Sequence, residues 1–253
     1  MGTIRKLYRS LLLVPLLIIG IILTVIFLRN TMPTSGIASS IVKAWLGITA
    51  RLLGVRIKSF GSALPDKTLF VANHISWLDI LILGHLVPIH FLSKQEVKTL
   101  PLFGWIATRA GTLYINRGGK NSASDASSEI TTALRQKHNS LIFAEGTTTD
   151  GHIKKFHSRM MQSAIDAQAM VQPVAIFYPL RNSVTQEIEI NPSTLFLGNT
   201  TLGESYNLIT RAAHTYVEVH FLEPINSRGK TRNEIASHAY DEVVNRIKLI
   251  KKQ

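Results

Sequence analysis

The strongest constraint on how this chain folds is an uninterrupted stretch without charged residues from Leu11 to Leu28. A helix of that length, rising about 1.5 Å per residue, would be roughly 27 Å long, close to the hydrocarbon thickness of a bilayer. A cleaved signal peptide is the alternative, since small residues follow at Ser35 to Ser40, but the apolar run exceeds the usual length in a signal peptide. We therefore predict a retained membrane helix. Basic residues flank it on both sides: Arg5, Lys6, Arg9 and Arg29.

The segment from Ile37 to Val55 differs, because its apolar residues recur at helical spacing while Lys43 and Arg51 interrupt a second clean span. One interpretation is an interfacial amphipathic helix with Trp45 at the depth of the lipid headgroups. The other is an ordinary amphipathic helix packed on the globular part. Both interpretations stay open. In either case we expect residues 1–55 to form an N-terminal membrane anchor and residues 56–253 to form one domain.

The chain is strongly basic, with 28 Lys and Arg against 16 Asp and Glu, a net charge of +12 and a pI near 10.1. Such a surface attracts a polyanion. The membrane helix indicates an anionic bilayer as that partner, and no nucleic acid is expected. Cysteine is absent, which excludes disulfides, thiolate zinc sites and cysteine nucleophiles.

Beyond the anchor, short β-rich runs alternate with helical stretches. This alternation predicts an α/β domain with a mixed, mostly parallel sheet flanked by helices. A last helix is expected from Thr231 to Lys252, where Thr231 and Glu234 form a capping-box pattern. The expected strands are Val55 to Phe60, Thr68 to Ala72, Thr112 to Ile115, Ser140 to Ala144, Val171 to Phe177 and Tyr216 to Leu222; further helices are expected at Ser122 to Lys137 and Met160 to Met170.

The sharpest local motif is Asn-His-Ile-Ser-Trp-Leu-Asp at residues 73–79, between the apolar strand Thr68 to Ala72 and a helical run. A histidine at a strand end faces a cleft, and Asp79 can fold back to hold one imidazole nitrogen of His74. The other nitrogen could then take a proton from a substrate hydroxyl. The structural alternative is a capped helix start, with Asn73 or Ser76 capping and Asp79 solvated near the helix dipole.

A second motif, Phe-Ala-Glu-Gly-Thr-Thr-Thr at residues 143–149, is again an apolar strand that breaks into a glycine and hydroxyl groups. Gly146 allows a ligand close to the backbone, and the amides and hydroxyls of Thr147 and Thr148 suit an oxyanion or a polar headgroup. An ordinary turn is the alternative. Arg117, which follows the strand Thr112 to Ile115, could bind a phosphate bidentately. No metal site is expected, because the spacing of the histidines matches no ligand motif.

Taken in order, these segments resemble the four sequence blocks of the glycerophospholipid acyltransferase family, whose type members are the 1-acylglycerol-3-phosphate acyltransferases. NHISWLD matches the first block, NHxxxxD, completely. GTLYINR, FAEGTTT and VQPVAI resemble the second, third and fourth blocks. The resemblance extends roughly from Lys58 to Pro224.

The resemblance implies that His74 is the catalytic base, that Asp79 is its partner, and that the remaining site residues bind the acceptor. It also implies transfer of a fatty acyl group from acyl-CoA or acyl-carrier protein to the hydroxyl of a lysolipid, with no metal or bound cofactor. The default acceptor is 1-acylglycerol-3-phosphate, giving phosphatidic acid; the alternative is another lysolipid, such as lyso-ornithine lipid. The acceptor-site residues are Asn73, Arg117, Glu145, Gly146, Thr147 and Thr148.

Two further expectations follow. Thr148 stands where the family often has arginine, which removes a phosphate ligand, so we expect weaker discrimination in favour of lysophosphatidic acid. We also expect Leu11 to Leu28 and Ile37 to Val55 to form a hairpin in one leaflet of a bacterial inner membrane, with the catalytic domain cytoplasmic. The alternative is a spanning helix with the N-terminus outside. A basic membrane-anchored protein that binds lipid or nucleic acid without turnover is the alternative from a different class; it would have no use for a base at a strand end.

Overall fold

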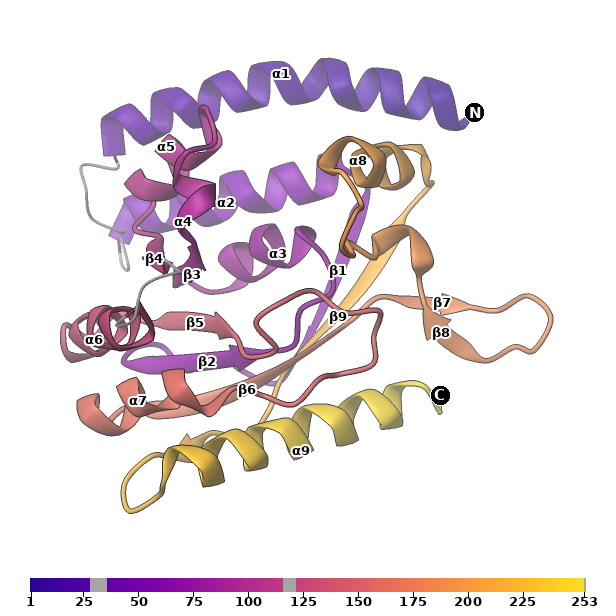
Figure 1. The fold of residues 1–253 in the computed structure, drawn as a ribbon. Coiled ribbons are helices and arrows are strands. Elements are labelled where there is room, and N and C mark those ends of the chain that lie inside the picture. Colours follow the sequence, from indigo (N-terminus) through magenta and orange to yellow (C-terminus); the bar gives the residue numbers. More distant parts are fainter. Residues whose placement is uncertain (28–35, 116–121, 253) are drawn as a thin grey trace.

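The computed structural model describes residues 1–27, 36–115 and 122–252. In this part of the chain, eight strands form one sheet in the order β1-β9-β6-β2-β5-β3-β4, with β10 paired to β6 (Figure 1). Two short strands, β7 and β8, form a separate antiparallel pair. The strands are β1 (Val55–Phe60), β2 (Thr68–Ala72), β3 (His90–Lys94), β4 (Leu113–Ile115), β5 (Ser140–Phe143), β6 (Met170–Phe177), β7 (Pro179–Arg181), β8 (Ile188–Ile190), β9 (Thr215–Phe221) and β10 (Ile225–Asn226).

Strands β6, β2, β5, β3 and β4 are parallel neighbours in the middle and at one side of the sheet. Strand β9 runs antiparallel to β6 and parallel to β1, so the sheet is mixed. The central strand β2 reads as a continuous apolar run, and each of its residues is buried, as expected of a strand that is covered on both faces. The predicted α/β class and the mixed, mostly parallel sheet are therefore confirmed.

Helices cover both faces of the sheet (Figure 1). Along β2, Leu69 and Val71 enter a core with α6, α7 and α9, whereas Phe70 and Ala72 enter a second core with α2, α3 and α8. The helices are α1 (Gly2–Phe27), α2 (Gly36–Leu52), α3 (Leu78–Leu86), α4 (Gln95–Lys98), α5 (Phe103–Arg109), α6 (Ser122–Arg135), α7 (Gln162–Ala167), α8 (Leu202–Arg211) and α9 (Arg232–Ile250), with short 3-10 turns η1 (Ser158–Met161) and η2 (Pro192–Thr194).

Most sequence predictions of individual elements hold to within a residue or two, and the capping box of Thr231 and Glu234 starts α9 as expected. One boundary is wrong. The helix expected to continue to Met170 ends at Ala167, because Gln168 turns into the left-handed region (φ 50°) and Met170 already begins β6. Strand β3, helix α8 and the β7–β8 pair have no counterpart in the sequence prediction.

The N-terminal helix α1 lies across the domain and packs on α8, α2 and α5 (Figure 1). Its mean hydropathy of 2.9 over 18 residues makes it long and apolar enough to cross a membrane by length and composition. Helix α2 is packed between α1 and α3, and Trp45 turns towards α1, where its indole N–H donates to the Leu16 carbonyl at 2.9 Å. Of the two interpretations of α2, the structure therefore supports the packed amphipathic helix.

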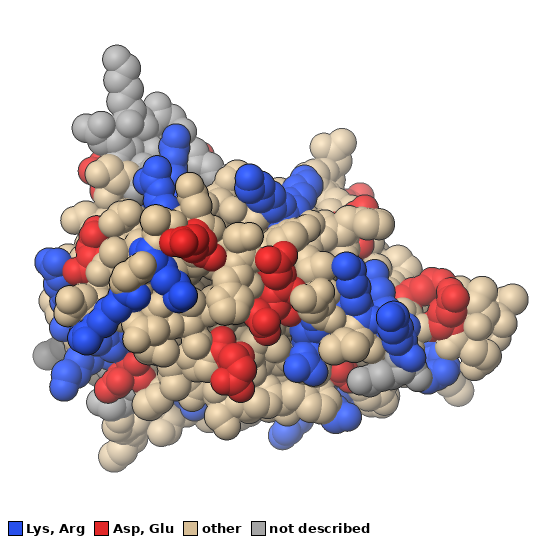
Figure 2. All heavy atoms as spheres, turned by 90° about the horizontal axis from the view of Figure 1, so that it is seen from below, with Lys and Arg blue, Asp and Glu red and all other residues tan. Residues whose placement is uncertain are grey.

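The two sides of the molecule differ in character. The outward face of α1 is an exposed apolar stripe, which we call the α1 stripe: Leu7, Leu11, Val14, Ile18, Ile22 and Val25. On the opposite side, seen from below in Figure 2, basic and acidic side chains are mixed over the surface around α9. A charged, mixed surface suits water, whereas a continuous apolar stripe does not.

Candidate active site

The site lies where three parallel strands end side by side. Ala72, the last residue of β2, is in register with Phe143 on β5 and with Val174 on β6. The chain leaves β2 at Asn73 and His74, leaves β5 at Ala144 and Glu145, and leaves β6 at Tyr178. The carboxyl ends of parallel strands are where α/β proteins place their ligands.

His74 and Asp79 form a hydrogen-bonded pair at this edge. The distance from His74 Nδ1 to Asp79 Oδ2 is 2.8 Å. The same carboxylate oxygen accepts the backbone N–H groups of Ile75 at 2.8 Å and Ser76 at 3.0 Å. Asp79 is 0% exposed, so the alternative in which it is a solvated residue near a helix start is wrong. Asp79 is instead folded back onto the histidine, as the motif predicted.

The surroundings of His74 favour one tautomer. A carboxylate accepts hydrogen bonds, so Nδ1 carries the proton and Nε2 keeps its lone pair. The ring stacks on Phe143, with centroids 3.7 Å apart and planes 12° from parallel. The side chain remains 17% exposed. A partly open imidazole with an oriented lone pair can accept a proton from a hydroxyl group.

Tyr178 contacts this pair through Asp79, and the sequence analysis does not predict it. Its hydroxyl donates to Asp79 Oδ1 at 2.6 Å, and the side chain is fully buried. Burial, and then the charge of Asp79, raises the pKa of the phenol well above its usual value. The phenol therefore stays protonated and remains a donor. The only sequence signal for it is a tyrosine directly after the apolar run of β6.

Asn73 and Glu145 hold the strand ends together. The Asn73 amide pairs with the backbone of Ile176 on β6, donating at 2.9 Å and accepting at 2.8 Å. Glu145 is buried, and its two oxygens accept the backbone N–H groups of His74 at 2.8 Å and Lys154 at 2.7 Å. Burial raises the pKa of Glu145, and these two hydrogen bonds oppose the rise. Contact of Asn73 and Glu145 with the acceptor stays a prediction.

The turn after β5 is tied to the His74 backbone at Glu145 and Thr149, and the predicted residues Gly146, Thr147 and Thr148 lie between them in sequence. Gly146 adopts φ +70°, where a side chain would be strained, and a Cβ there would lie 3.3 Å from the His157 ring. Thr147 is exposed, and the Thr148 hydroxyl donates to the Phe196 carbonyl. The backbone N–H of Thr149 donates to the His74 carbonyl at 2.9 Å.

The remaining sequence predictions concern Arg117 and metals. Arg117 lies outside the described residues, so its predicted contact with the acceptor stays a prediction. His152 contacts Asp150, with 3.2 Å between Nδ1 and Oδ1, and its side chain is 91% exposed. Among the described residues, no group of three His, Cys, Asp or Glu side chains is arranged to hold a metal ion.

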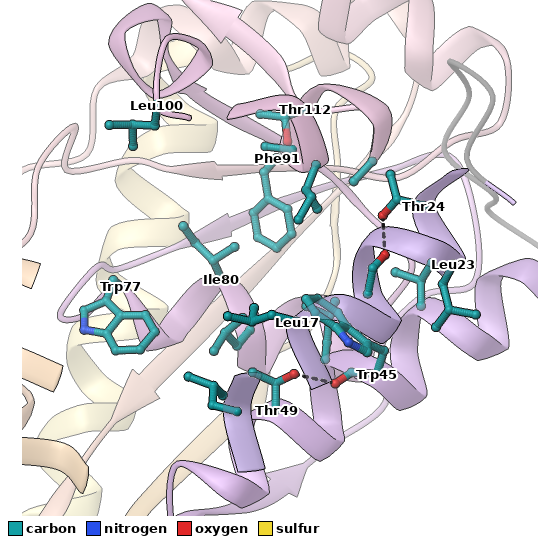
Figure 3. A pocket seen from close by; sticks show the side chains of 18 of the residues that line it. Leu17, Leu23, Thr24, Trp45, Thr49, Trp77, Ile80, Phe91, Leu100 and Thr112 are labelled. Atoms are coloured by element: carbon teal, nitrogen blue, oxygen red, sulfur yellow. Dashed lines mark hydrogen bonds between the residues drawn. The ribbon is translucent and has the colours of Figure 1, made fainter. Parts of the chain in front are cut away.

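An apolar cavity of about 600 Å³ opens between α1, α2, α3, α5 and α8. Three polar groups on its wall are already bonded: the hydroxyls of Thr24 and Thr49 donate to helix carbonyls at 2.7 and 2.8 Å, as Figure 3 shows, and Trp77 Nε1 donates to Ser205 at 3.0 Å. Its volume falls in the range of small-molecule sites, about 300–1,000 Å³. Residues on its wall include Leu17, Leu23, Trp45, Trp77, Ile80, Phe91, Leu100 and Ala107.

Comparisons with known proteins agree on one family. Residues 57–177 match the family model described as Acyltransferase. The chain is 37% identical over 248 residues to the lyso-ornithine lipid O-acyltransferase of Pseudomonas aeruginosa, covering 96% of this chain and 93% of that protein. It is 33% identical over 141 residues to the 1-acyl-sn-glycerol-3-phosphate acyltransferase of Neisseria meningitidis, covering 55% of each. The crystal structure of the 1-acyl-sn-glycerophosphate acyltransferase from Thermotoga maritima superposes with a TM-score of 0.72, at 19% identity over 100% of this chain and 99% of that one.

Proposed function

This chain belongs to the acyltransferase family, and from that premise we propose that it transfers a fatty acyl group from a thioester donor to the hydroxyl of lyso-ornithine lipid. The observation that carries the proposal is the His74–Asp79 pair at the carboxyl ends of three adjacent strands. The relative that matches almost the whole chain is named for that acceptor. The default acceptor of the sequence prediction, 1-acylglycerol-3-phosphate, is the second candidate.

The reaction needs one base and no covalent enzyme intermediate. His74 Nε2 accepts the proton of the acceptor hydroxyl as its oxygen attacks the thioester carbon. The tetrahedral intermediate then collapses, the C–S bond breaks, and the imidazolium returns its proton to the departing thiolate. Asp79 stabilises the transient positive charge. A placed general base typically contributes about 10²–10⁴ in rate.

Thr148 supports an acceptor without a phosphate. A phosphate is held best by two or more cations, preferably with a bidentate arginine. Position 148 has only the hydroxyl of Thr148, which already donates to the Phe196 carbonyl. A lyso-ornithine headgroup carries a carboxylate and an ammonium instead of a phosphate, so it makes no demand for a second arginine.

We assign the apolar cavity to the acyl chain of the donor. A donor presented by a soluble carrier, either coenzyme A or acyl-carrier protein, must bring its chain out of water, and apolar burial is worth about 0.8 kcal/mol per methylene. Trp77 lines the cavity three residues after His74. A chain that passes Trp77 would place its thioester carbon near the imidazole.

The anchor lies in one leaflet of the membrane in this proposal. The α1 stripe faces outward along the length of the helix, and the other side of α1 packs on the domain. Arg5 and Arg9 donate to carbonyls at the end of α8. A helix fixed along its length to the domain fits an in-plane position better than a perpendicular span. The catalytic domain is then cytoplasmic, where thioester donors are found, and the anionic inner-membrane surface is its partner.

The acceptor is tested with purified protein and a panel of lysolipids, by following thiol release from acyl-CoA and from acyl-carrier protein. We expect release with lyso-ornithine lipid, a weaker response to lysophosphatidic acid, and loss of both in His74→Ala. Thr148→Arg should raise the relative use of lysophosphatidic acid by about 1.5–3 kcal/mol in kcat/KM if a charged hydrogen bond forms. A wild-type enzyme strongly selective for lysophosphatidic acid, and not improved by arginine, would contradict the acceptor assignment.

The membrane arrangement is tested with topology reporters inserted after Met32 and fused at Gln253. Both should report the cytoplasm. A periplasmic signal from the Gln253 fusion would exclude the in-plane hairpin with a cytoplasmic catalytic domain.

A further inference from the structure

Asp79 is held from two directions. Its Oδ2 faces the motif loop and accepts from His74, Ile75 and Ser76, all close in sequence. Its Oδ1 accepts from Tyr178, which is 99 residues away and comes from the end of β6. We propose that Tyr178 is a positioning residue that fixes the rotation of the Asp79 carboxylate and so sets the proton affinity of His74. The inference rests on the proposed role of His74 as base.

A phenol is suited to this role. Tyr178 is fully buried within the core that contains β6, α2, α3 and α8, so water has no access to replace its hydroxyl. The pKa of the phenol is raised well above its usual value, so the group remains a donor throughout the pH range of an enzyme assay. A buried carboxylate without a donor on one oxygen would be poorly solvated on that side.

The hydroxyl also has an electrostatic effect on the pair. A donor on Oδ1 draws negative charge away from Oδ2, and Oδ2 is the oxygen that contacts His74. Without that donor, Asp79 attracts the protonated imidazole more strongly, so the acid limb of the pH profile moves to higher pH. Asp79 on α3 contacts the imidazole itself, Glu145 after β5 accepts the His74 backbone N–H, and Tyr178 after β6 reaches the imidazole only through Asp79.

The test is the pH profile of Tyr178→Phe. This substitution keeps the ring and removes only the hydroxyl. We expect the acid limb of kcat/KM to move to higher pH by on the order of half a unit to one unit. At the plateau, kcat should fall by about 3- to 30-fold, because the imidazole is oriented less well. The KM for the acceptor should stay within about twofold, since Tyr178 lies behind Asp79 and does not reach the acceptor.

A matched control is Tyr240→Phe, a tyrosine on α9 that packs edge-on against Phe156 on the other face of the sheet. It should leave the pH profile and kcat unchanged. Coupling is tested in the Asp79→Asn background, where Tyr178→Phe should have little further effect. A full additional loss there, or an unchanged pH profile in the single variant, would overturn the proposal.

A second variant keeps the test decisive if Tyr178→Phe fails to fold. Site-specific 3-fluorotyrosine at position 178 preserves the size and the hydroxyl but makes it a stronger donor. The acid limb should then move to lower pH, opposite to the phenylalanine variant. Any His74-dependent acyl transfer suffices as the readout, whichever lysolipid is the acceptor. Failure of the proposed function would instead appear as a wild-type enzyme without acyl transfer.

Discussion

Replacing Ala107 on α5 with phenylalanine should shorten the acyl chain that the enzyme accepts. Ala107 lines the apolar cavity. In Figure 1, α5 lies beneath the C-terminal half of α1, whereas α8 lies beneath its N-terminal half. Trp77, bonded to Ser205 on α8, therefore lies at the α8 end of the cavity, and Ala107 lies at the α5 end. In the proposed function the thioester lies beside Trp77, which makes the α5 end the distant one. A larger side chain on α5 removes space from the methyl end of a bound chain.

The size of the effect follows from apolar burial. Each methylene excluded from the cavity loses about 0.8 kcal/mol, which is about fourfold in kcat/KM. A phenyl ring fills the space of several methylenes, so a donor that exceeds the shortened cavity by two methylenes should lose about 1.6 kcal/mol, or roughly 15-fold. Shorter donors should be unaffected. The profile of kcat/KM against chain length should therefore shift without a change at its short end.

The assay is initial-rate thiol release with a series of saturated acyl donors and one fixed acceptor. Ala44→Phe is the matched control, because Ala44 lies exposed on α2 and does not line the cavity. Equal loss for all donors would refute the assignment of this cavity to the donor chain. If the profile shifted with the chain of the lysolipid, at fixed donor, the cavity would hold the acceptor.

Three further predictions concern buried polar groups. Arg9 donates to carbonyls at the end of α8, so Arg9→Ala should reduce the free energy of unfolding in detergent by about 1–3 kcal/mol, and Arg5→Ala, whose bond is exposed, by less. Glu145→Gln replaces one of the two oxygens that accept backbone N–H groups with an amide nitrogen, which can only donate. Steady-state kinetics should then show a lower kcat and little change in the KM for the acceptor. Burial lowers the pKa of His90 and of His220 below the ordinary imidazole value of 6.5, so the unfolded chain binds more protons than the folded one. The stability that these two residues contribute is therefore fully present above about pH 6.5 and is lost as the pH falls below it. The free energy of unfolding, measured in urea at several pH values, should show this dependence. His90→Asn should weaken the pH dependence, and the part due to His220 should remain.

The sequence predicted the sheet well where burial dominates. Strand β2 is covered on both faces, so its apolar run identifies it, and the strand-to-helix break after it identifies His74 and Asp79. Helix α8 was missed although Thr201 and Glu204 form the same capping box that revealed α9. Helix α8 is mostly polar, so no apolar run in the sequence indicates it. The signal was present, and a systematic search for capping boxes would have found it.

Other features depend on contacts between residues far apart in the sequence, which no local sequence pattern predicts. Tyr178 acquires its role only because β6 lies beside β2, which brings its hydroxyl to a carboxylate far away in sequence. Strand β3 is short and follows a proline, and it is a strand because β5 and β4 pair with it. Tertiary pairing overrides weak local preference in such elements.

The basic residues before the apolar helix show how one pattern can have two physical causes. In a sequence, Arg5 and Arg9 count as charges that flank a membrane helix and set its orientation. In the structure, Arg9 is buried, and its guanidinium donates to the Thr210, Ala212 and Ala213 carbonyls, at 2.9, 2.8 and 2.9 Å. Cations are favourable at a helix C-terminus. Arg5 and Arg9 therefore attach α1 to the domain, and their charges give little information about the side of the membrane from which α1 enters.

That attachment gives α1 two roles that cannot be separated. Its outward face is the α1 stripe, and its inward face supplies Leu13, Leu17 and Leu23 to the wall of the apolar cavity. A helix that only anchored the enzyme could be exchanged for any other apolar helix. Here the same helix also forms part of the cavity wall, and Arg9 fixes its position along α8. If the α1 stripe meets the lipid and the cavity holds the donor chain, as proposed, the same contacts set the depth of the enzyme in the membrane and the geometry of that cavity.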